Sequence, residues 1–188
     1  MQKDLNAMQQ NKARADLTMD LLLVAFLIGF DVAARLLPHA YGFLPVAASG
    51  LFAARVLRMP ALAVIVPFAA MLLSGVALGQ DDWRVSLIVY AALAIPALAG
   101  IATRRWQGAV PIVATMVGSS LAFFILSNAA VWAFSGLYPV TQQGLVECFV
   151  AALPFLDKTI MGDLFWTAVL FGGAWLVQHG PALARRAL

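Results

Sequence analysis

Long runs of apolar residues alternate with short polar or basic segments along most of the chain. A helix rises about 1.5 Å per residue, so it crosses the hydrocarbon layer of a bilayer with roughly 20 apolar residues. By this measure the pattern predicts six spans, over residues 17–37, 43–57, 61–79, 85–102, 110–134 and 160–178. The second is the shortest. We therefore expect an all-α integral membrane protein built as a six-helix bundle.

The remaining segments divide the chain further. Residues 141–155 are apolar but number only about fifteen, which favours a short re-entrant or interfacial helix before the last span. Residues 1–16 form a polar N-terminal tail that could be a short surface helix, residues 17–180 the membrane domain, and residues 181–188 a basic C-terminal tail. The sequence thus predicts one membrane domain with polar ends.

Composition supports the membrane assignment and excludes several functions. Hydrophobic residues make up 63% of the chain, charged residues 11%, and the mean hydropathy is +0.89, whereas soluble domains are about 25% charged. The net charge of +3 is spread as single residues and pairs, which argues against nucleic-acid binding. The sequence has neither a P-loop pattern nor GxGxxG, and no metal-ligand spacing or nucleophile–base pair. We expect no enzyme activity, no cofactor and no metal.

The distribution of lysine and arginine predicts the orientation. Six crossings place most basic residues on the side of the two termini: Lys3, Lys12, Arg14, Arg55, Arg58, Arg104, Arg105, Arg185 and Arg186. The opposite side receives only Arg84 and Lys158. Because basic loops stay in the cytoplasm, both termini are expected there. A seventh crossing at residues 141–155 would disturb this pattern.

Unusual polar and aromatic residues then collect on the non-cytoplasmic side, where we expect an outward-facing cavity. The candidate lining residues are Arg35, His39, Asn128, Trp132, Tyr138, Thr141, Glu147 and Asp163. Ionisable side chains at membrane depth usually face a partner or a wet cavity. Asp31 and Arg35, at i and i+4, form either a self-neutralising pair or a site where Arg35 binds an anionic group. Asp163 is a second candidate partner for Arg35 or a helix cap.

Other residues have equally open interpretations. His39 is either a loop residue bonded to backbone or a ligand-binding group. Asn128 bonds either a neighbouring helix or a ligand. The aromatic side chains near the outer interface form either a lipid-facing belt or the walls of a pocket. They are Tyr41, Trp132, Tyr138 and Trp166. Cys148 is either a small buried hydrophobe or, less favoured, a thiolate for a soft metal in a ligand.

Small residues repeat at four-residue spacing on the first predicted helix, at Ala25, Gly29 and Ala33. Small residues in this pattern let another helix approach closely. The partner is either a helix of the same bundle or a separate membrane subunit.

Two blocks of the sequence resemble an uncharacterised bacterial membrane-protein family that is itself similar to the substrate-binding S components of energy-coupling-factor (ECF) vitamin transporters. The first block is Arg35-Leu-Leu-Pro38-His39 with Phe43-x-Pro45. The second includes Asn128-x-x-Val-Trp132, Tyr138-Pro139-x-Thr141 and Gly162-Asp163-Leu164. The likeness spans most of the chain. It predicts Asn before the Phe of the first block, where this chain has Gly42.

The resemblance implies a multi-pass protein of the bacterial inner membrane that binds a small micronutrient from outside. It also implies that Ala25 and Gly29 dock a transmembrane coupling subunit driven by separate ATPases. Our leading hypothesis is therefore a vitamin-like substrate-binding or uptake protein. The alternative is a structural accessory subunit of a larger membrane complex without its own ligand. An intramembrane enzyme using Asp31, His39, Glu147 or Asp163 ranks last.

Overall fold

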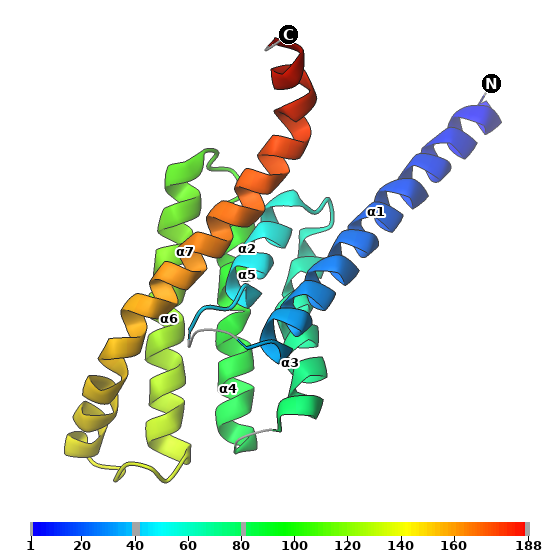
Figure 1. Ribbon diagram of the computed structural model, residues 1–188. Helices are drawn as coiled ribbons and strands as arrows, with labels where there is room; N and C mark the ends of the chain where they lie inside the picture. The colour runs from blue at the N-terminus through cyan, green and yellow to red at the C-terminus, as the bar shows by residue number, and fades with distance from the viewer. Residues whose placement is uncertain (1, 39–41, 80–81, 187–188) are drawn as a thin grey trace.

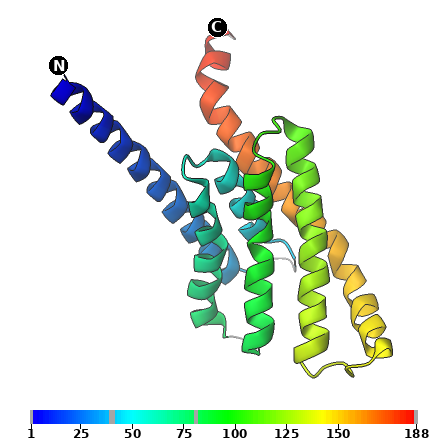
Figure 2. The same ribbon diagram turned by 180° about the vertical axis from the view of Figure 1, so that it is seen from behind.

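The computed structural model describes residues 2–38, 42–79 and 82–186. Within these ranges the chain is helical and contains no strand, which confirms the all-α prediction. The elements are α1 (Gln2–Leu36), α2 (Val46–Val56), η1 (Pro60–Val64), α3 (Ile65–Leu78), α4 (Trp83–Leu93), α5 (Ile95–Ala102), α6 (Ala109–Phe134) and α7 (Gln142–Arg186). Figures 1 and 2 show them as an elongated bundle from which the N-terminal part of α1 projects.

Five helical stretches of the described chain are long and apolar enough to cross a membrane. They are Leu5–Leu36, Pro60–Leu78, Trp83–Ala102, Ala109–Phe134 and Gln142–His179. The predicted spans at 61–79, 85–102 and 110–134 agree closely with three of them. The stretch Trp83–Ala102 is divided at Ala94, because Pro96 in the first turn of α5 has no N–H to continue the ladder of α4.

The second predicted span differs from the others. It is the 11-residue helix α2, shorter than the spanning length. Every residue from Val46 to Ala54 is buried, and α2 packs against α5, η1, α7 and α3. Both ribbon views show it in the middle of the bundle (Figures 1 and 2). A short helix that is apolar on all sides is stable here because other helices enclose it.

The end of α1 and the start of α2, with the described residues of the link between them, lie part-way along the bundle instead of at its end (Figure 1). The described residues of the link contact α7 near Gly162, and Ser120 of α6 bonds the neighbouring Asp163. From Ser120, α6 continues to Phe134, about 20 Å further along the helix. Non-helical backbone at this depth is tolerated where protein buries it or where it lines a cavity.

The segment after α6 is where the sequence prediction was wrong. A separate re-entrant helix was expected at 141–155, but residues 142–186 form the single helix α7. The expectation came from the length of the apolar run, yet Pro154, Asp157 and Lys158 near its end all lie inside the helix. Proline is tolerated in membrane helices, and Asp157 and Lys158 are exposed, so neither side chain needs a buried partner. Residues 2–16 likewise continue α1 instead of forming a separate helix.

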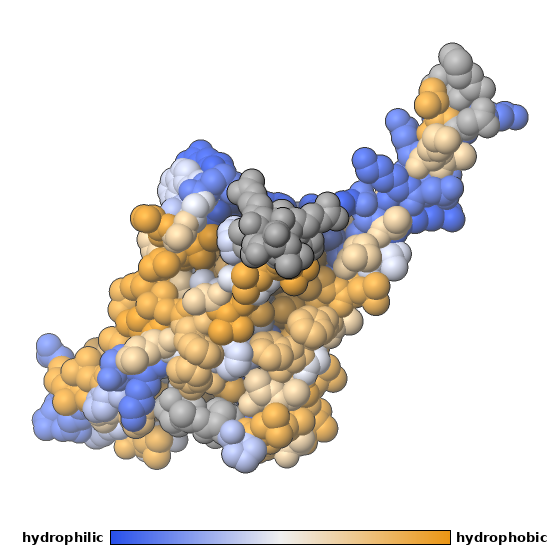
Figure 3. Space-filling model, turned by 45° about the horizontal axis from the view of Figure 1, so that its top comes forward, coloured by the Kyte–Doolittle hydropathy of each residue, from blue (hydrophilic) through white to orange (hydrophobic). Residues whose placement is uncertain are grey.

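Apolar side chains cover the outside of the bundle. Val76, Val110 and Val177 are 87%, 80% and 79% exposed. Figure 3 shows hydrophobic residues over the body of the molecule and hydrophilic residues mainly on the N-terminal part of α1 and at the ends of the bundle. Such a surface suits lipid, so the chain has the character of a multi-pass membrane protein.

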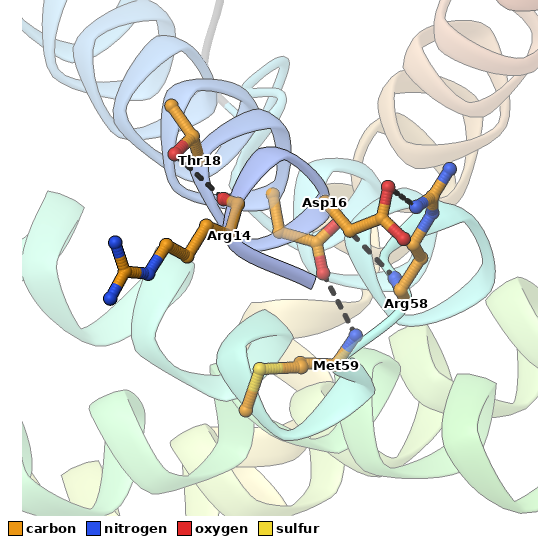
Figure 4. A network of polar contacts seen from close by, with 6 residues as sticks. Arg14, Asp16, Thr18, Arg58 and Met59 are labelled. Carbon is orange, nitrogen blue, oxygen red and sulfur yellow. Dashed lines mark hydrogen bonds and ion pairs between the residues drawn. The ribbon is translucent and has the colours of Figure 1, made fainter. Parts of the chain in front are cut away.

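The start of α1 and the end of α7 lie at the same end of the bundle, which we call the terminal end. The end of α3, the start of α4 and the α6–α7 turn lie at the other, the loop end (Figure 1). At the terminal end Asp20 is buried and accepts hydrogen bonds from the backbone N–H groups of Arg58 and Met59, at 3.3 and 2.9 Å. Asp16 forms an ion pair with the Arg58 side chain, and Figure 4 shows these two side chains pointing toward one another. These contacts tie α1 to the turn between α2 and η1.

Candidate functional site

A cavity of about 330 Å³ lies between the α1–α2 link and the loop end. It falls at the lower end of the volumes typical of ligand sites. Helices α1, α2, α3, α4, α6 and α7 contribute to it. The lining residues are Arg35, Gly42, Leu44, Val46, Ala47, Met71, Val89, Leu93, Phe123, Phe124, Asn128, Ala152, Phe155, Thr159 and Asp163. Most of these are apolar, with a few polar groups among them, as in sites for small organic molecules.

Arg35 stands at the end of α1 and lines the cavity. Its Nε donates a hydrogen bond of 2.7 Å to Ser74 Oγ on α3, and the Ser74 hydroxyl in turn donates to Ala70 O at 2.7 Å. The guanidinium is half-buried. Its two terminal amino groups make no hydrogen bond to the described residues, and Tyr90 and Asp31 are near enough to interact with it electrostatically. A guanidinium fork is the side chain best suited to bind a carboxylate or phosphate.

Asp163 lines the same cavity from α7 and is only 5% exposed. Its Oδ2 lies 2.6 Å from Ser120 Oγ on α6. Its Oδ1 has no hydrogen-bond partner among the described residues, and it is not one of the fully enclosed unpaired atoms. Asp163 therefore brings one unbonded carboxylate oxygen to a residue position that lines the cavity. Arg35 and Asp163 form no ion pair with each other.

Near Asp163, the backbone of α7 lies very close to the backbone of the α1–α2 link. A Cβ on Gly162 of α7 would lie 2.7 Å from Gly42 O and 3.0 Å from the Cα of Phe43. Gly42 has φ of +76°, a region that glycine and asparagine adopt most readily. The Asn that the resemblance predicts at this position and the Gly found there therefore suit the same backbone. Trp166 Nε1 donates to Phe43 O at 3.5 Å and secures the link further.

The sequence that forms this cavity matches a known family model. The model of the DUF6580 family, a family of unknown function, matches residues 15–184. The chain belongs to this family. Comparisons with curated proteins and with solved structures find no match. The matched range includes every cavity residue, so the site belongs to the part of the chain that defines a DUF6580 protein.

In this DUF6580 chain, three of the predicted site residues line one cavity: Arg35, Asn128 and Asp163. Asn128 Nδ2 donates to Phe124 O at 2.8 Å on its own helix, and its backbone O accepts a 3.5 Å contact from Cys148 Sγ. Cys148 is buried and does not line the cavity. The interpretation of Cys148 as a small buried hydrophobe therefore fits better than that of a metal ligand.

Four other predicted residues build the α6–α7 turn and do not line the cavity. Trp132 Nε1 donates to Pro139 O at 3.1 Å. Thr141 Oγ1 accepts from the N–H of Gly144 at 3.1 Å, which makes it the N-cap of α7. Exposed Glu147 accepts from Gln143 at 2.9 Å, and Tyr138 is half-buried in the turn. These contacts fix the start of α7 at the loop end.

His39 and Tyr41 lie outside the described residues. Asp31 is completely buried on α1, where Oδ1 accepts from Ser49 Oγ at 2.7 Å and Oδ2 has no partner. No direct ion pair joins Asp31 to Arg35 in the described chain, although the two side chains are close enough to interact electrostatically. Trp166 packs on Phe30 and Phe43 and is absent from the cavity.

Two parts of the lining were not predicted from the sequence: Thr159, and the aromatic side chains Phe123, Phe124 and Phe155. The signal for Thr159 was its spacing: it precedes Asp163 by four residues and so shares its face of α7. No comparable signal marks the phenylalanines in a chain this rich in apolar residues. Among the described residues no group of three His, Cys, Asp or Glu side chains could hold a metal ion.

The small-residue face of α1 lies on the outside of the bundle. Ala25, Gly29 and Ala33 are all exposed, and a Cβ on Gly29 would meet no atom within 4 Å. The face is therefore not used for packing within the described part of this chain.

Proposed function

We propose that this protein is a membrane substrate-binding or uptake protein that captures a small organic, vitamin-like micronutrient in the cavity lined by α1, α2, α3, α4, α6 and α7. The observation that carries the proposal is one mostly apolar cavity at membrane depth with Arg35, Asn128 and Asp163 in its wall. Ionisable residues at this depth are rare and usually mark a pathway or a binding site. No covalent chemistry is needed for capture.

We further propose that the loop end faces the outside of the bacterial inner membrane. The basic side chains Arg58, Arg104 and Arg105 belong to turns at the terminal end. Arg104 Nη2 donates to Leu57 O at 2.6 Å, which joins two of these turns. Positively charged turns are retained in the cytoplasm, and the cavity would then receive its ligand from outside.

Six membrane-inserted helices with an outward cavity are also the arrangement that the ECF S-component type implies, with α2 as the short second member. The sequence has no nucleotide-hydrolysing motif, so uphill transport needs a partner or an ion gradient. The exposed Ala25–Gly29–Ala33 face supports docking of a transmembrane coupling subunit, since small side chains permit close helix contact.

Native mass spectrometry of the full chain, purified in mild detergent, tests the capture function. Ala152 lines the cavity and is 8% exposed, whereas neighbouring Ala151 is exposed on the outside of α7. Wild type and Ala151→Phe are expected to carry a bound small molecule that Ala152→Phe excludes. A chain that releases no small molecule, and gains no thermal stability from any vitamin or related nutrient tested, would contradict the proposal.

The second candidate function is an accessory subunit of a larger membrane complex without its own ligand. It is favoured by the projecting start of α1, where Leu5 and Met8 are 49% and 70% exposed. Co-purification of a stable assembly that is lost in Gly29→Leu but kept in Ala77→Leu, an exposed position on α3, would support a partner. Wild-type nutrient uptake after deletion of the protein would favour this function over capture.

A further inference from the structure

We propose that the cavity selects a molecule bearing both an anionic and a cationic group on a small apolar body, with Arg35 binding the anion and Asp163 the cation. This inference rests on the proposed function and narrows its substrate class. Its starting point is that one basic and one acidic side chain, on α1 and α7, line the same cavity.

The two charges are held by neighbouring helices and not by each other. Ser74 of α3 accepts from Arg35 Nε at 2.7 Å, and Ser120 of α6 lies 2.6 Å from Asp163 Oδ2. Each serine fixes one side of the charged group. The other side, consisting of the terminal amino groups of Arg35 and Oδ1 of Asp163, has no hydrogen-bond partner in the described chain.

Leaving charged groups without partners away from water is unfavourable. A direct Arg35–Asp163 pair would remove that cost, yet both side chains are anchored to serines instead. Complementary charges on a bound molecule would compensate both groups at once. The guanidinium fork matches a carboxylate or phosphate, and a single free carboxylate oxygen matches an ammonium N–H.

The rest of the wall defines the body of that molecule. Phe123, Phe124 and Phe155 supply aromatic surface, and the volume of about 330 Å³ sets a small size. Asn128 adds an amide on the side nearer the loop end. Such chemistry has two sources: a free zwitterionic metabolite with a ring or short chain, or the headgroup of a zwitterionic lipid.

Two sets of probes on the detergent-purified full chain separate these sources. The free-metabolite set is L-tryptophan, N-acetyl-L-tryptophan, which lacks the cation, and tryptamine, which lacks the anion. The lipid set is dihexanoyl phosphatidylethanolamine against dihexanoyl phosphatidylglycerol. The readouts are the thermal unfolding midpoint and mass spectrometry of the molecules released from the protein. The doubly charged compound of one set is expected to stabilise most.

Variants assign each charge to its residue. Arg35→Gln is expected to weaken binding of the doubly charged probe about tenfold or more, and Asp163→Asn to do the same. Arg35→Lys keeps the positive charge but not the planar guanidinium, so its affinity for the probe should fall less than that of Arg35→Gln. The matched controls are Arg84→Gln and Asp157→Asn, whose side chains are exposed at the loop end and on the outside of α7. Both should bind as wild type does.

The wild-type probe comparison does not depend on whether any variant folds. The charge assignment is overturned if a singly charged analogue stabilises the protein as much as the doubly charged probe does. It is also overturned if the control variants lose as much affinity as the Arg35 and Asp163 variants. It is also overturned if no probe stabilises the protein and no released molecule carries both groups. If a released molecule is still excluded by Ala152→Phe in that case, capture stands and only the charge assignment fails.

Discussion

The two ends of the bundle use charged side chains in different ways. At the terminal end, Asp20 accepts two backbone N–H groups and Arg104 donates to a backbone carbonyl. Toward the loop end, Arg35 and Asp163 are each held by one serine and keep an unbonded side toward a cavity. Charges bonded to backbone close turns, whereas charges left open at membrane depth are available to a ligand. Stability and binding should therefore depend on different residues.

The largest stability effect is expected at the terminal end. Asp20→Ala leaves the N–H groups of Arg58 and Met59 without their acceptor, and hydrogen bonds to charged groups contribute roughly 1.5–3 kcal/mol each. A loss of about 3 kcal/mol is expected in reversible unfolding from detergent micelles. Asp16→Ala is the matched control, because its ion pair with Arg58 is largely solvent-exposed and such pairs contribute about 0–1 kcal/mol. Equal losses in both variants would contradict the structural role of Asp20.

The wall of the cavity should respond next. Gly162→Ala places a methyl group 2.7 Å from Gly42 O, a backbone atom, so the link must move. Overpacking of this kind costs about 1–3 kcal/mol, and the displaced wall should also weaken ligand retention in native mass spectrometry. Gly172→Ala on the same helix meets nothing within 4 Å and should leave stability unchanged or slightly higher. If Gly162→Ala behaves like Gly172→Ala, the close approach of link and helix is wrong.

A smaller effect is expected at the α6–α7 turn. Thr141→Ala removes the side-chain acceptor of Gly144 N–H at the start of α7, and loss of such a cap costs about 1 kcal/mol. Thr18→Ala removes a hydroxyl that bonds only Arg14 O on an exposed helix face, and should change the unfolding free energy by less. Ligand retention should survive Thr141→Ala, since Thr141 does not line the cavity. Loss of the ligand without loss of stability would move Thr141 into the binding site.

The smallest change in stability is expected for Asp163→Asn, which should nevertheless strongly weaken ligand binding. Asp163→Asn keeps an atom for Ser120 to bond and removes an incompletely paired buried charge. The unfolding free energy should therefore change by less than about 1 kcal/mol. The same protein should lose its bound molecule. A stability loss as large as that of Asp20→Ala would mean that Asp163 is a structural residue and would remove the contrast between the two ends.

Apolar run length was sufficient to predict three of the spans, because hydrocarbon thickness fixes helix length. It could not predict that α2 is enclosed by its neighbours, since a buried helix and a lipid-facing helix have the same apolar pattern. It also failed at residues 141–155, where the short apolar run is part of the long helix α7 and Pro154 lies inside that helix. Local helix-breaking signals are weak where a continuous helix is the only way to satisfy the backbone in lipid.

The site was predicted in part for a related reason. Charged and amide groups are conspicuous in an apolar chain, so Arg35, Asn128 and Asp163 were identified before the cavity that joins them. Trp132 and Glu147 were equally conspicuous, but their bonds are local to the turn. A position near one membrane face does not show whether a residue lines the cavity, as Asn128 does, or only stabilises the turn, as Trp132 does. The difference depends on which helix faces meet, and that is a property of the fold.

Side-specific cysteine labelling tests most directly whether the cavity opens to the outside. In a Cys148→Ala background, Asn128→Cys places a thiol in the cavity wall and Gln107→Cys places one at the terminal end. In intact cells, a membrane-impermeant maleimide should label position 128, and position 107 only after permeabilisation. Labelling of position 107 in intact cells, or no labelling of position 128 under either condition, would contradict an outward-opening capture site.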